Sequence, residues 1–236
     1  MISEPKSLAA LELTDVAKQY PGSPPVNALD GVSLRINHGE LVAIVGPSGS
    51  GKSTMLNVMG TLDLPTSGSV RIDGREVSKF SERRLSAVRS HLIGFVFQSF
   101  FLLDGVSALD NVANGLLYSG VRSRIRRARA ATALETVGLG HRLGHVPNQM
   151  SGGEQQRVAI ARAIVSEPSI ILADEPTGNL DTNSSATVMS LLHDLNQAGS
   201  TIVVITHDTD VASSLPRQVA FRDGRIETDS ALAGSR

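Results

Sequence analysis

The sequence contains no cysteine among its 236 residues. This absence excludes a disulfide framework, a thiolate metal site and a cysteine nucleophile, and it fits a cytosolic protein. The sequence also has no run of about 18 consecutive apolar residues and no apolar core near its start, so we expect neither direct membrane insertion nor a signal peptide. Because the formal net charge is only −1, no overall basic field favours nucleic acid as a partner.

The residues that are present suffice for one folded domain. Hydrophobic residues make up 41% of the chain and charged residues 19%, which is ordinary for a globular protein and excludes wholesale disorder. We expect one domain over residues 8–228, with flexible tails at residues 1–7 and 229–236.

Two kinds of strand are predicted. Val32, Leu34 and Ile36 alternate with polar residues, a pattern typical of a half-buried strand. The Asp-Gly pairs at residues 73–74 and 223–224 follow short apolar segments and predict antiparallel hairpins. Four other apolar runs are continuous and rich in β-branched residues, which favours parallel strands buried on both faces, at residues 41–45, 93–97, 170–173 and 201–206.

Helical patterns fill the intervals between these runs. Apolar residues recur at helical spacing between residues 187 and 197, and Gly199 is the expected C-cap. Residues 100–168 contain no comparable strand and are expected to be mostly helical. The sequence therefore predicts an α/β core with a parallel sheet, an antiparallel β lobe and a helical subdomain at about residues 99–165.

A glycine-rich loop follows the first of the buried runs. Residues 46–53 match the pattern G-x-x-x-x-G-K-[ST], in which glycines let consecutive N–H groups surround an anion and the following helix N-terminus adds positive potential. Lys52 is expected to reach the β- and γ-phosphates of a nucleotide, and the Ser53 hydroxyl to ligate Mg²⁺. A chance glycine-rich turn is the alternative, and the strand–loop–helix context argues against it. The predicted nucleotide-binding residues of this loop are Gly46, Pro47, Ser48, Gly49, Ser50, Gly51, Lys52, Ser53 and Thr54.

Two adjacent acids end the third buried run. Asp174 is expected to hold Mg²⁺, and Glu175 to orient the attacking water as a general base. In isolation the pair could be two solvated acids at a strand end. The phosphate-binding loop upstream favours the catalytic interpretation, because phosphoryl transfer needs both a metal ion and a positioned water.

A third segment distinguishes among nucleotide hydrolases. Residues 150–157 (M-S-G-G-E-Q-Q-R) resemble the LSGGQ signature of ABC ATPases, with Met for Leu and Glu for Gln. Tyr20 is similar to the aromatic residue that stacks on adenine in this family, and Gln98 resembles the Q-loop glutamine that binds Mg²⁺ or water. Residues 179–181 look like the D-loop, and His207 looks like the switch histidine. The resemblance covers nearly the whole chain and implies the ABC ATPase fold, built on a P-loop NTPase core.

The resemblance also implies how the signature acts. Ser151 and Glu154 form the pattern of a capping box at a helix start, which is a position suited to anions. In the family, this helix start completes the γ-phosphate site of a partner molecule, so ATP lies between the two subunits of a homodimer. The implied catalytic residues are Glu175, His207, Lys52 and Gln98, and the implied nucleotide contacts outside the loop are Tyr20, Ser151, Gly152, Gly153, Glu154 and Asp181.

Several of these features have plainer interpretations. Tyr20 could be an ordinary packed aromatic residue, and His207 could be a histidine that is satisfied at a strand end. S-G-G-E alone could be a helix N-cap with nothing bound. The five arginines between residues 122 and 129 could suggest nucleic acid or acidic lipid, but the neutral chain favours a solvated helix face.

The spelling D-E-P-T-G-N-L-D at residues 174–181 is similar to the lipoprotein-release, macrolide-exporter and FtsE-type ATPases. That branch implies an ATP-hydrolysing subunit with ATP and Mg²⁺ as ligands. It also implies a separate permease with few transmembrane helices and a large extracytoplasmic domain, which holds the subunit at the cytoplasmic face of the membrane. An importer ATPase, or a soluble ABC ATPase outside transport, is the alternative. We expect the permease to dock beside Gln98, where residues 99–103 are unusually apolar for a loop.

Overall fold

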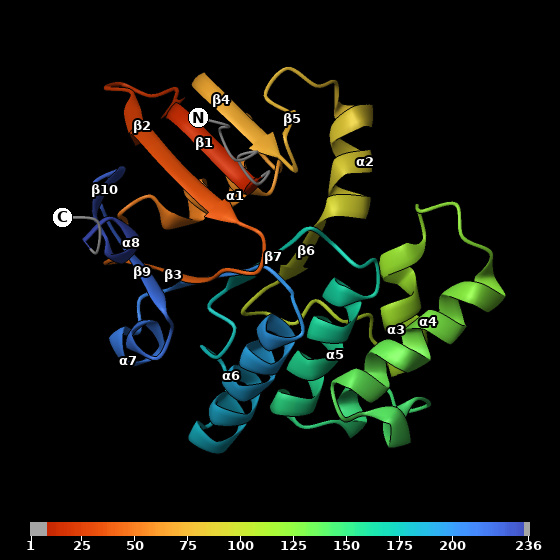
Figure 1. Ribbon diagram of the computed structural model, residues 1–236. Helices are drawn as coiled ribbons and strands as arrows, with labels where there is room; N and C mark the ends of the chain where they lie inside the picture. Colours follow the sequence, from red (N-terminus) through yellow and green to blue (C-terminus); the bar gives the residue numbers. More distant parts are fainter. Residues whose placement is uncertain (1–8, 234–236) are drawn as a thin grey trace, which may run out of the picture.

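The computed structural model describes residues 9–233. An antiparallel sheet lies at the top of Figure 1, a mainly parallel sheet lies in the middle, and helices lie below. The antiparallel sheet has the order β2-β1-β4-β5. Val32, Leu34 and Ile36 are buried on one side of β2, as their alternation predicts. The strands of this sheet are β1 (Ala9–Tyr20), β2 (Val26–Asn37), β4 (Ser67–Ile72) and β5 (Arg75–Glu76).

The second sheet has six strands in the order β10-β9-β3-β8-β7-β6. Neighbouring strands from β9 to β6 run parallel, and β10 returns antiparallel to β9 through the predicted hairpin at residues 223–224. The four continuous apolar runs of the sequence form β3, β6, β7 and β8, so that prediction is confirmed. The bounds are β3 (Leu41–Val45), β6 (Ile93–Val96), β7 (Ile170–Asp174), β8 (Ile202–Thr206), β9 (Arg217–Arg222) and β10 (Arg225–Asp229).

Helices occupy the chain between β6 and β7, where the sequence predicts no strand. In Figure 1, α3, α4 and α5 form a lobe at the lower right, and they pack against one another. Among the described residues, no helix is both long enough and apolar enough to cross a membrane. The α-helices are α1 (Lys52–Met59), α2 (Glu82–Leu92), α3 (Ala108–Ala113), α4 (Ser123–Thr136), α5 (Gly152–Ile164), α6 (Thr182–Gln197), α7 (Thr209–Ser213) and α8 (Ser230–Ala233), and the 3-10 turns are η1 (Asn114–Leu116), η2 (Gly140–Arg142) and η3 (Pro147–Gln149).

Successive residues of the central strands enter two different cores. Val42 and Ile44 of β3 belong to the core that lies between the two sheets and includes α1. Leu41 and Ala43 of the same strand belong to the core formed with the helices. This alternation explains why the strands are apolar along most of their length: successive residues are mostly buried, but on opposite faces.

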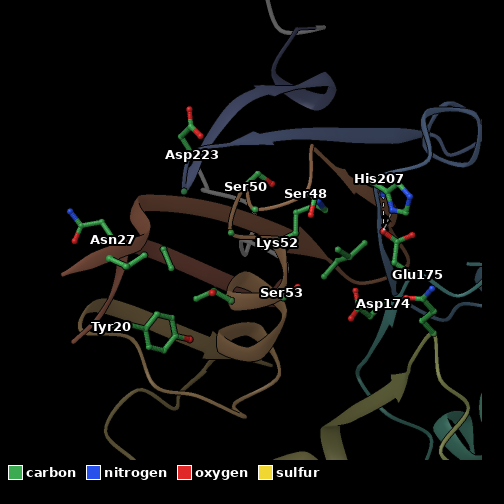
Figure 2. A pocket seen from close by; sticks show the side chains of 18 residues that line it. Tyr20, Asn27, Ser48, Ser50, Lys52, Ser53, Asp174, Glu175, His207 and Asp223 are labelled. Atoms are coloured by element: carbon green, nitrogen blue, oxygen red, sulfur yellow. Dashed lines mark hydrogen bonds and ion pairs between the residues drawn. The ribbon is translucent and has the colours of Figure 1, made fainter. Parts of the chain in front are cut away.

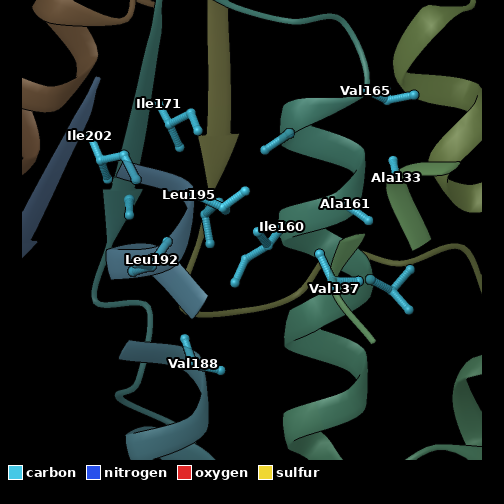
Figure 3. Packing of buried hydrophobic residues seen from close by; sticks show 14 of the residues in the cluster. Ala133, Val137, Ile160, Ala161, Val165, Ile171, Val188, Leu192, Leu195 and Ile202 are labelled. Carbon is cyan, nitrogen blue, oxygen red and sulfur yellow. The ribbon is translucent and has the colours of Figure 1, made fainter. Parts of the chain in front are cut away.

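Helices α5 and α6 cover the second face of the parallel sheet (Figure 3). Val188, Leu192 and Leu195 of α6 are buried there, whereas Leu191 lies half-buried at the edge of the same core. The chain leaves α6 through Gly199, whose φ of 104° lies in the left-handed region. Glycine adopts this conformation without a Cβ clash. The C-cap itself is Ala198, so Gly199 lies one residue beyond the predicted cap position.

The C-terminal end differs from the sequence prediction of a loose tail from residue 229. β10 continues through Asp229, and α8 follows it. The guanidinium group of Arg217 donates to both carboxylate oxygens of Asp229, at 3.0 and 2.6 Å, and also pairs with Glu40. These contacts hold the end of the strand against β9. The tail predicted at residues 1–7 lies outside the described residues.

Candidate active site

A cleft of about 780 Å³ opens where the antiparallel sheet meets the carboxyl ends of the parallel strands (Figure 2). Ligands of open α/β sheets bind at this edge because the loops after the strands converge there. Segments far apart in the sequence line the cleft. They are the ends of β1, β7 and β8, the start of β2, the loop at residues 48–54, Gln98 and the β9–β10 turn.

The loop that joins β3 to α1 packs tightly against its neighbours, and its glycines make this possible. A Cβ on Gly46 would lie 2.0 Å from the carbonyl oxygen of Phe221. Gly51 has a φ of 101°, and a Cβ there would lie 2.3 Å from the carbonyl oxygen of Ala28. Since Gly51 is the N-cap of α1, the first N–H groups of that helix, which lack intrahelical partners, lie at the end of the loop and can bind an anion.

Lys52 is the first residue of α1, and its side chain folds back across the loop. Nζ donates to the carbonyl oxygens of Gly46 (2.6 Å) and Pro47 (2.8 Å). Burial lowers the pKa of Lys52, and the negative charges of Glu175 and Asp174 oppose that shift. The ammonium group is therefore held between the loop and two carboxylates, where nucleotide phosphates can reach it.

Glu175 follows β7 in a strained conformation. Its φ of 45° is one that residues other than glycine rarely adopt, and its N–H donates to the Ile205 carbonyl at 2.8 Å. The carboxylate accepts from the Thr206 hydroxyl and from the His207 backbone N–H, both at 2.9 Å. Nδ1 of His207 also contacts the Glu175 carboxylate (Figure 2). These contacts fix the carboxylate at the cleft, as a positioned base requires.

Asp174 has the surroundings of a cation ligand. Burial raises the pKa of Asp174, the neighbouring charge of Glu175 raises it further, and Lys52 opposes the shift. Ser53 borders the same cleft. Within the part of the chain that the structure describes, no group of three or more His, Asp or Glu side chains could hold a metal by itself.

We expect Asp174→Asn to raise the melting temperature of the nucleotide-free protein by roughly 1–3 °C near neutral pH. When folding raises the pKa of a carboxyl group, the folded protein becomes less stable as the pH rises from the unfolded-state pKa through the folded-state pKa. This loss of stability persists at neutral pH. The same variant should gain less stability from Mg²⁺ and ATP. Calorimetry measures both effects.

Asp104→Asn makes the same chemical change on an exposed loop and is the control. Its melting temperature should match that of the parent. A melting temperature of Asp174→Asn below that of the parent would contradict the prediction.

Gln98 lies just beyond β6 and borders the cleft. Its Nε2 donates to Asn179 Oδ1 at 3.1 Å, and Asn179 Nδ2 donates to the Gln98 carbonyl oxygen at 3.0 Å. A Cβ on Gly178 would lie 2.7 Å from Gln98 Nε2, so the glycine makes room for this contact. The two segments that resemble the Q-loop and the D-loop are therefore joined directly.

Tyr20 ends β1 and borders the cleft together with Val26 and Asn27 of β2. Figure 2 shows Tyr20 on one side of the cleft and His207 on the other, with Lys52 between them. A nucleotide whose base lies against Tyr20 could therefore extend its phosphates toward Lys52.

The signature helix begins elsewhere. The Glu154 N–H donates to Ser151 Oγ at 3.2 Å, and the Ser151 N–H donates to Glu154 Oε2 at 2.8 Å, so the predicted capping box is confirmed. The hydrogen bond from the Ser151 N–H is the main cause that lowers the pKa of Glu154, and the charge of Arg142 contributes. Residues 151–154 do not line the cleft of their own chain. The structure therefore does not bring the signature to the phosphate-binding loop of the same molecule.

Asp181 also lies outside the cleft. It caps α6: the Ser184 N–H donates to Oδ1 at 3.0 Å and the Ser184 hydroxyl donates to Oδ2 at 2.6 Å. These two hydrogen bonds lower the pKa of Asp181. Within one chain Asp181 is a helix cap, and its contact with a nucleotide stays a prediction.

Two contacts at the site were not evident from the sequence. The Gly224 N–H donates to the Ser50 carbonyl oxygen at 2.9 Å, so the β9–β10 turn supports the phosphate-binding loop. Gln156 of α5 is fully buried, and its Nε2 donates to the Pro176 carbonyl oxygen at 2.7 Å and to the Phe97 carbonyl oxygen at 3.3 Å. The sequence signal for the Gln156 contacts was a polar residue on a helix face that is otherwise apolar. No sequence signal indicated the contact between the β9–β10 turn and the phosphate-binding loop.

Comparison with known proteins agrees with this arrangement. A family model described as ABC transporter matches residues 29–178, which is more than half of the chain. A protein of Thermotoga maritima, described as an uncharacterized ABC transporter ATP-binding protein, is 53% identical over 92% of this chain and 93% of its own length. The macrolide export ATP-binding/permease protein MacB of Chlorobaculum tepidum is 50% identical over 93% of this chain and 34% of its own length. The chain therefore spans about a third of that relative.

Solved structures of ABC cassettes are also similar to this chain. The ATP-binding cassette MJ0796, a dimer in a post-hydrolysis state bound to ADP and Pi, matches with a TM-score of 0.83 and 44% identity over 93% of this chain and 97% of that one. A second dimeric structure of that cassette, described as a bacterial ABC transporter cassette, matches with a TM-score of 0.83 and 45% identity, with the same coverage.

Proposed function

Because this chain belongs to the ABC transporter family, we propose that it is the ATPase of a macrolide-exporter-like transporter and that it closes as an ATP-bound homodimer beneath a separate permease. Family membership makes the chain an ATP-binding and ATP-hydrolysing subunit, and its fold is the ABC ATPase fold that the sequence predicts. The dimer, the residue roles, the metal and the permease surface belong to the proposal.

The cleft has groups for both ends of an ATP molecule. The loop at residues 46–54 would bind the phosphates, and Tyr20 would stack on the base. Mg²⁺ would be held by Ser53, Asp174 and Gln98. When bound, it would offset the negative charge of the phosphates and of the half-buried Asp174 carboxylate.

Glu175 is the proposed general base. Its side chain is 16% exposed, whereas that of His207 is 68% exposed, so the histidine lies on the open side of the carboxylate. Hydrogen bonds from Thr206 and from the backbone of His207 orient the carboxylate, which could then accept a proton from an attacking water. The exposed imidazole could contact the γ-phosphate.

The separation between the signature and the cleft carries the dimer proposal. Ser151 and Glu154 form a capping box at the start of α5, but the nucleotide cleft of the same chain does not include this helix start. A helix start favours an anion because of its free N–H groups and its dipole. Two copies related by a two-fold axis would each offer this helix start to the phosphates of the other. The similar cassettes that were solved as dimers support this arrangement.

ATP is expected to convert the purified chain from monomer to dimer, and ADP is not. The γ-phosphate is the group that the partner's signature would bind, so without it the dimer lacks its central contact. Light scattering with each nucleotide measures the mass. A single mass that does not depend on the nucleotide, whether monomer or dimer, would rule out this assembly.

Ser151→Asp tests in the same experiment whether the signature faces the partner's γ-phosphate. Aspartate is as good an N-cap as serine, so α5 should keep its start. Its carboxylate would repel the partner's γ-phosphate, and we expect the ATP-dependent dimer to weaken by about tenfold or more while ATP still binds to the monomer. An undiminished dimer would mean that the signature does not face the phosphate.

The proposed permease surface is a groove of about 330 Å³ bordered by Phe97, Phe101 and Arg162. Phe101 is 66% exposed and Leu103 is 53% exposed, whereas Leu102 between them packs against the helical core. Arg162 of α5 donates to the Phe101 carbonyl oxygen at 2.5 Å. An apolar groove of this kind suits a short amphipathic helix.

The permease itself is proposed from the relatives. MacB of Chlorobaculum tepidum is described as an ATP-binding/permease protein, and the part that matches this chain is about a third of it. A permease with few transmembrane helices and a large extracytoplasmic domain would hold this subunit at the cytoplasmic face of the membrane. Dimer closure would then perform mechanical work on the permease.

A further inference from the structure

Three side chains contact one another at the rim of the cleft. The Tyr20 hydroxyl donates to Asp63 Oδ2 at 2.9 Å, and Lys18 Nζ donates to Asp63 Oδ1 at 2.7 Å. Lys18 Nζ also lies over the Tyr20 ring, 4.9 Å from its centroid. Each residue contacts both of the others, so the Tyr20 ring is held both at its hydroxyl and at one face.

The backbone fixes Asp63 relative to the phosphate-binding loop. The Asp63 N–H donates to the carbonyl oxygen of Asn57, in α1, at 3.1 Å. The Leu64 N–H donates to Asp63 Oδ1 at 2.8 Å, and Lys18 Nζ donates to the Leu64 carbonyl oxygen at 2.9 Å. Since α1 begins at Lys52, this one helix carries the phosphate-binding lysine at its start and supports the anchor of the aromatic ring at its end.

The charges of this cluster are shielded. The side chain of Lys18 is 14% exposed and that of Asp63 is 31% exposed, so solvent and salt weaken the pair less than a fully exposed one. Burial alone would raise the pKa of Asp63. The hydrogen bonds from Lys18, from Tyr20 and from the Leu64 N–H outweigh burial and keep the pKa below its usual value. The carboxylate therefore stays ionised at neutral pH.

We propose that Asp63 and Lys18 are positioning residues that hold the Tyr20 ring ready to stack on the nucleotide base, and that they thereby set the affinity of the cleft for adenine nucleotides. The inference rests on the proposed function, because it requires the base to lie against Tyr20. Lys18 covers one face of the ring, and the base would stack on the other. A ring that is already ordered loses less side-chain entropy when the base binds.

The test compares ATP with inorganic tripolyphosphate, which has no base, as ligands of the purified chain in calorimetry. Asp63→Asn and Lys18→Met are each expected to raise the Kd of ATP about five- to tenfold, a sizeable part of the value of one base–aromatic stack. The Kd of tripolyphosphate should not change. The kcat at saturating ATP should stay within about twofold of the parental value, because the phosphate end is untouched.

If Asp63 and Lys18 had a merely structural role, their substitution would weaken the binding of ATP and of tripolyphosphate together. That result in both variants would overturn the inference. Asp73→Asn is the matched control. Asp73 pairs with His38 at 3.2 Å beside the same antiparallel sheet, its side chain is 34% exposed, and it lies outside the cleft. The affinities for both ligands should stay parental in this control. In a Tyr20→Ala background, Asp63→Asn should add no further loss of ATP affinity.

Lys52→Ala separates this inference from the proposed function. This variant should lower the affinity for both ATP and tripolyphosphate, because Lys52 is proposed to bind phosphate. If it does so while Asp63→Asn and Lys18→Met bind ATP like the parent, the positioning role is wrong and the nucleotide site stands. If Lys52→Ala weakens neither ligand, the proposed nucleotide site itself is wrong, and the inference falls with it.

Discussion

Glu175→Gln is expected to keep ATP bound with near-parental affinity and to slow hydrolysis about 10²-fold or more. The amide oxygen can still accept the hydrogen bond from the His207 backbone N–H, and the amide NH2 can donate to the Thr206 hydroxyl oxygen in place of accepting from it, so the side chain should keep its place. An amide cannot accept a proton from water at neutral pH, and the basic group is lost while the geometry remains. Phosphate release at saturating ATP measures the rate, and a fluorescent nucleotide measures the affinity.

Two comparisons make this result specific. Glu167→Gln makes the same chemical change at an exposed position outside the cleft and should hydrolyse ATP at the parental rate. Lys52→Ala should lose nucleotide affinity rather than rate alone. The Glu175 variant should also prolong the life of the ATP-bound dimer, because the proposed dimer would open only after hydrolysis. A parental rate in Glu175→Gln would remove Glu175 from the mechanism.

Phe101→Glu is expected to abolish co-purification of the chain with its permease and to remove any stimulation of hydrolysis by that permease. Phe101 is 66% exposed, adopts a φ of 48°, and packs its ring edge-on against Phe97 with centroids 5.5 Å apart. A carboxylate in this groove would have to be desolvated when an apolar helix docks, at a cost of several kcal/mol. Because the side chain is exposed in the free chain, folding should be unaffected.

Pull-down with the proposed permease, followed by ATPase assays with and without it, measures the effect. Leu103→Glu, at a position 53% exposed, should behave in the same way. Leu62→Glu is the control, since Leu62 is 49% exposed but lies outside the predicted docking segment at residues 99–103 and does not border the groove. Loss of folding in both the Phe101→Glu and the Leu103→Glu variants would mean that these residues belong to the core, and unchanged co-purification would locate the permease elsewhere.

Local chemistry let the sequence by itself determine several parts of this protein. The phosphate-binding loop is recognisable because its glycines, Lys52 and Ser53 act within eight consecutive residues. The capping box of Ser151 and Glu154 is likewise confined to one helical turn. The central strands were evident for a related reason. Burial on both faces requires a continuous apolar run, such as residues 41–45. Such a run can be recognised in the sequence without knowing which strand lies beside it.

Only the tertiary structure decided which distant groups meet. Tyr20 and Asp63 are 43 residues apart in the chain, yet they share a hydrogen bond because the loop after α1 runs beside the end of β1. Arg217 likewise pairs with Glu40, 177 residues away, and with Asp229, where the sequence predicted a loose tail. Residue type and short-range spacing do not predict such pairs, because the packing of whole sheets and helices determines which distant side chains meet. The same packing keeps the signature helix away from the cleft of its own chain, which supports the two-subunit site that the family resemblance already implies.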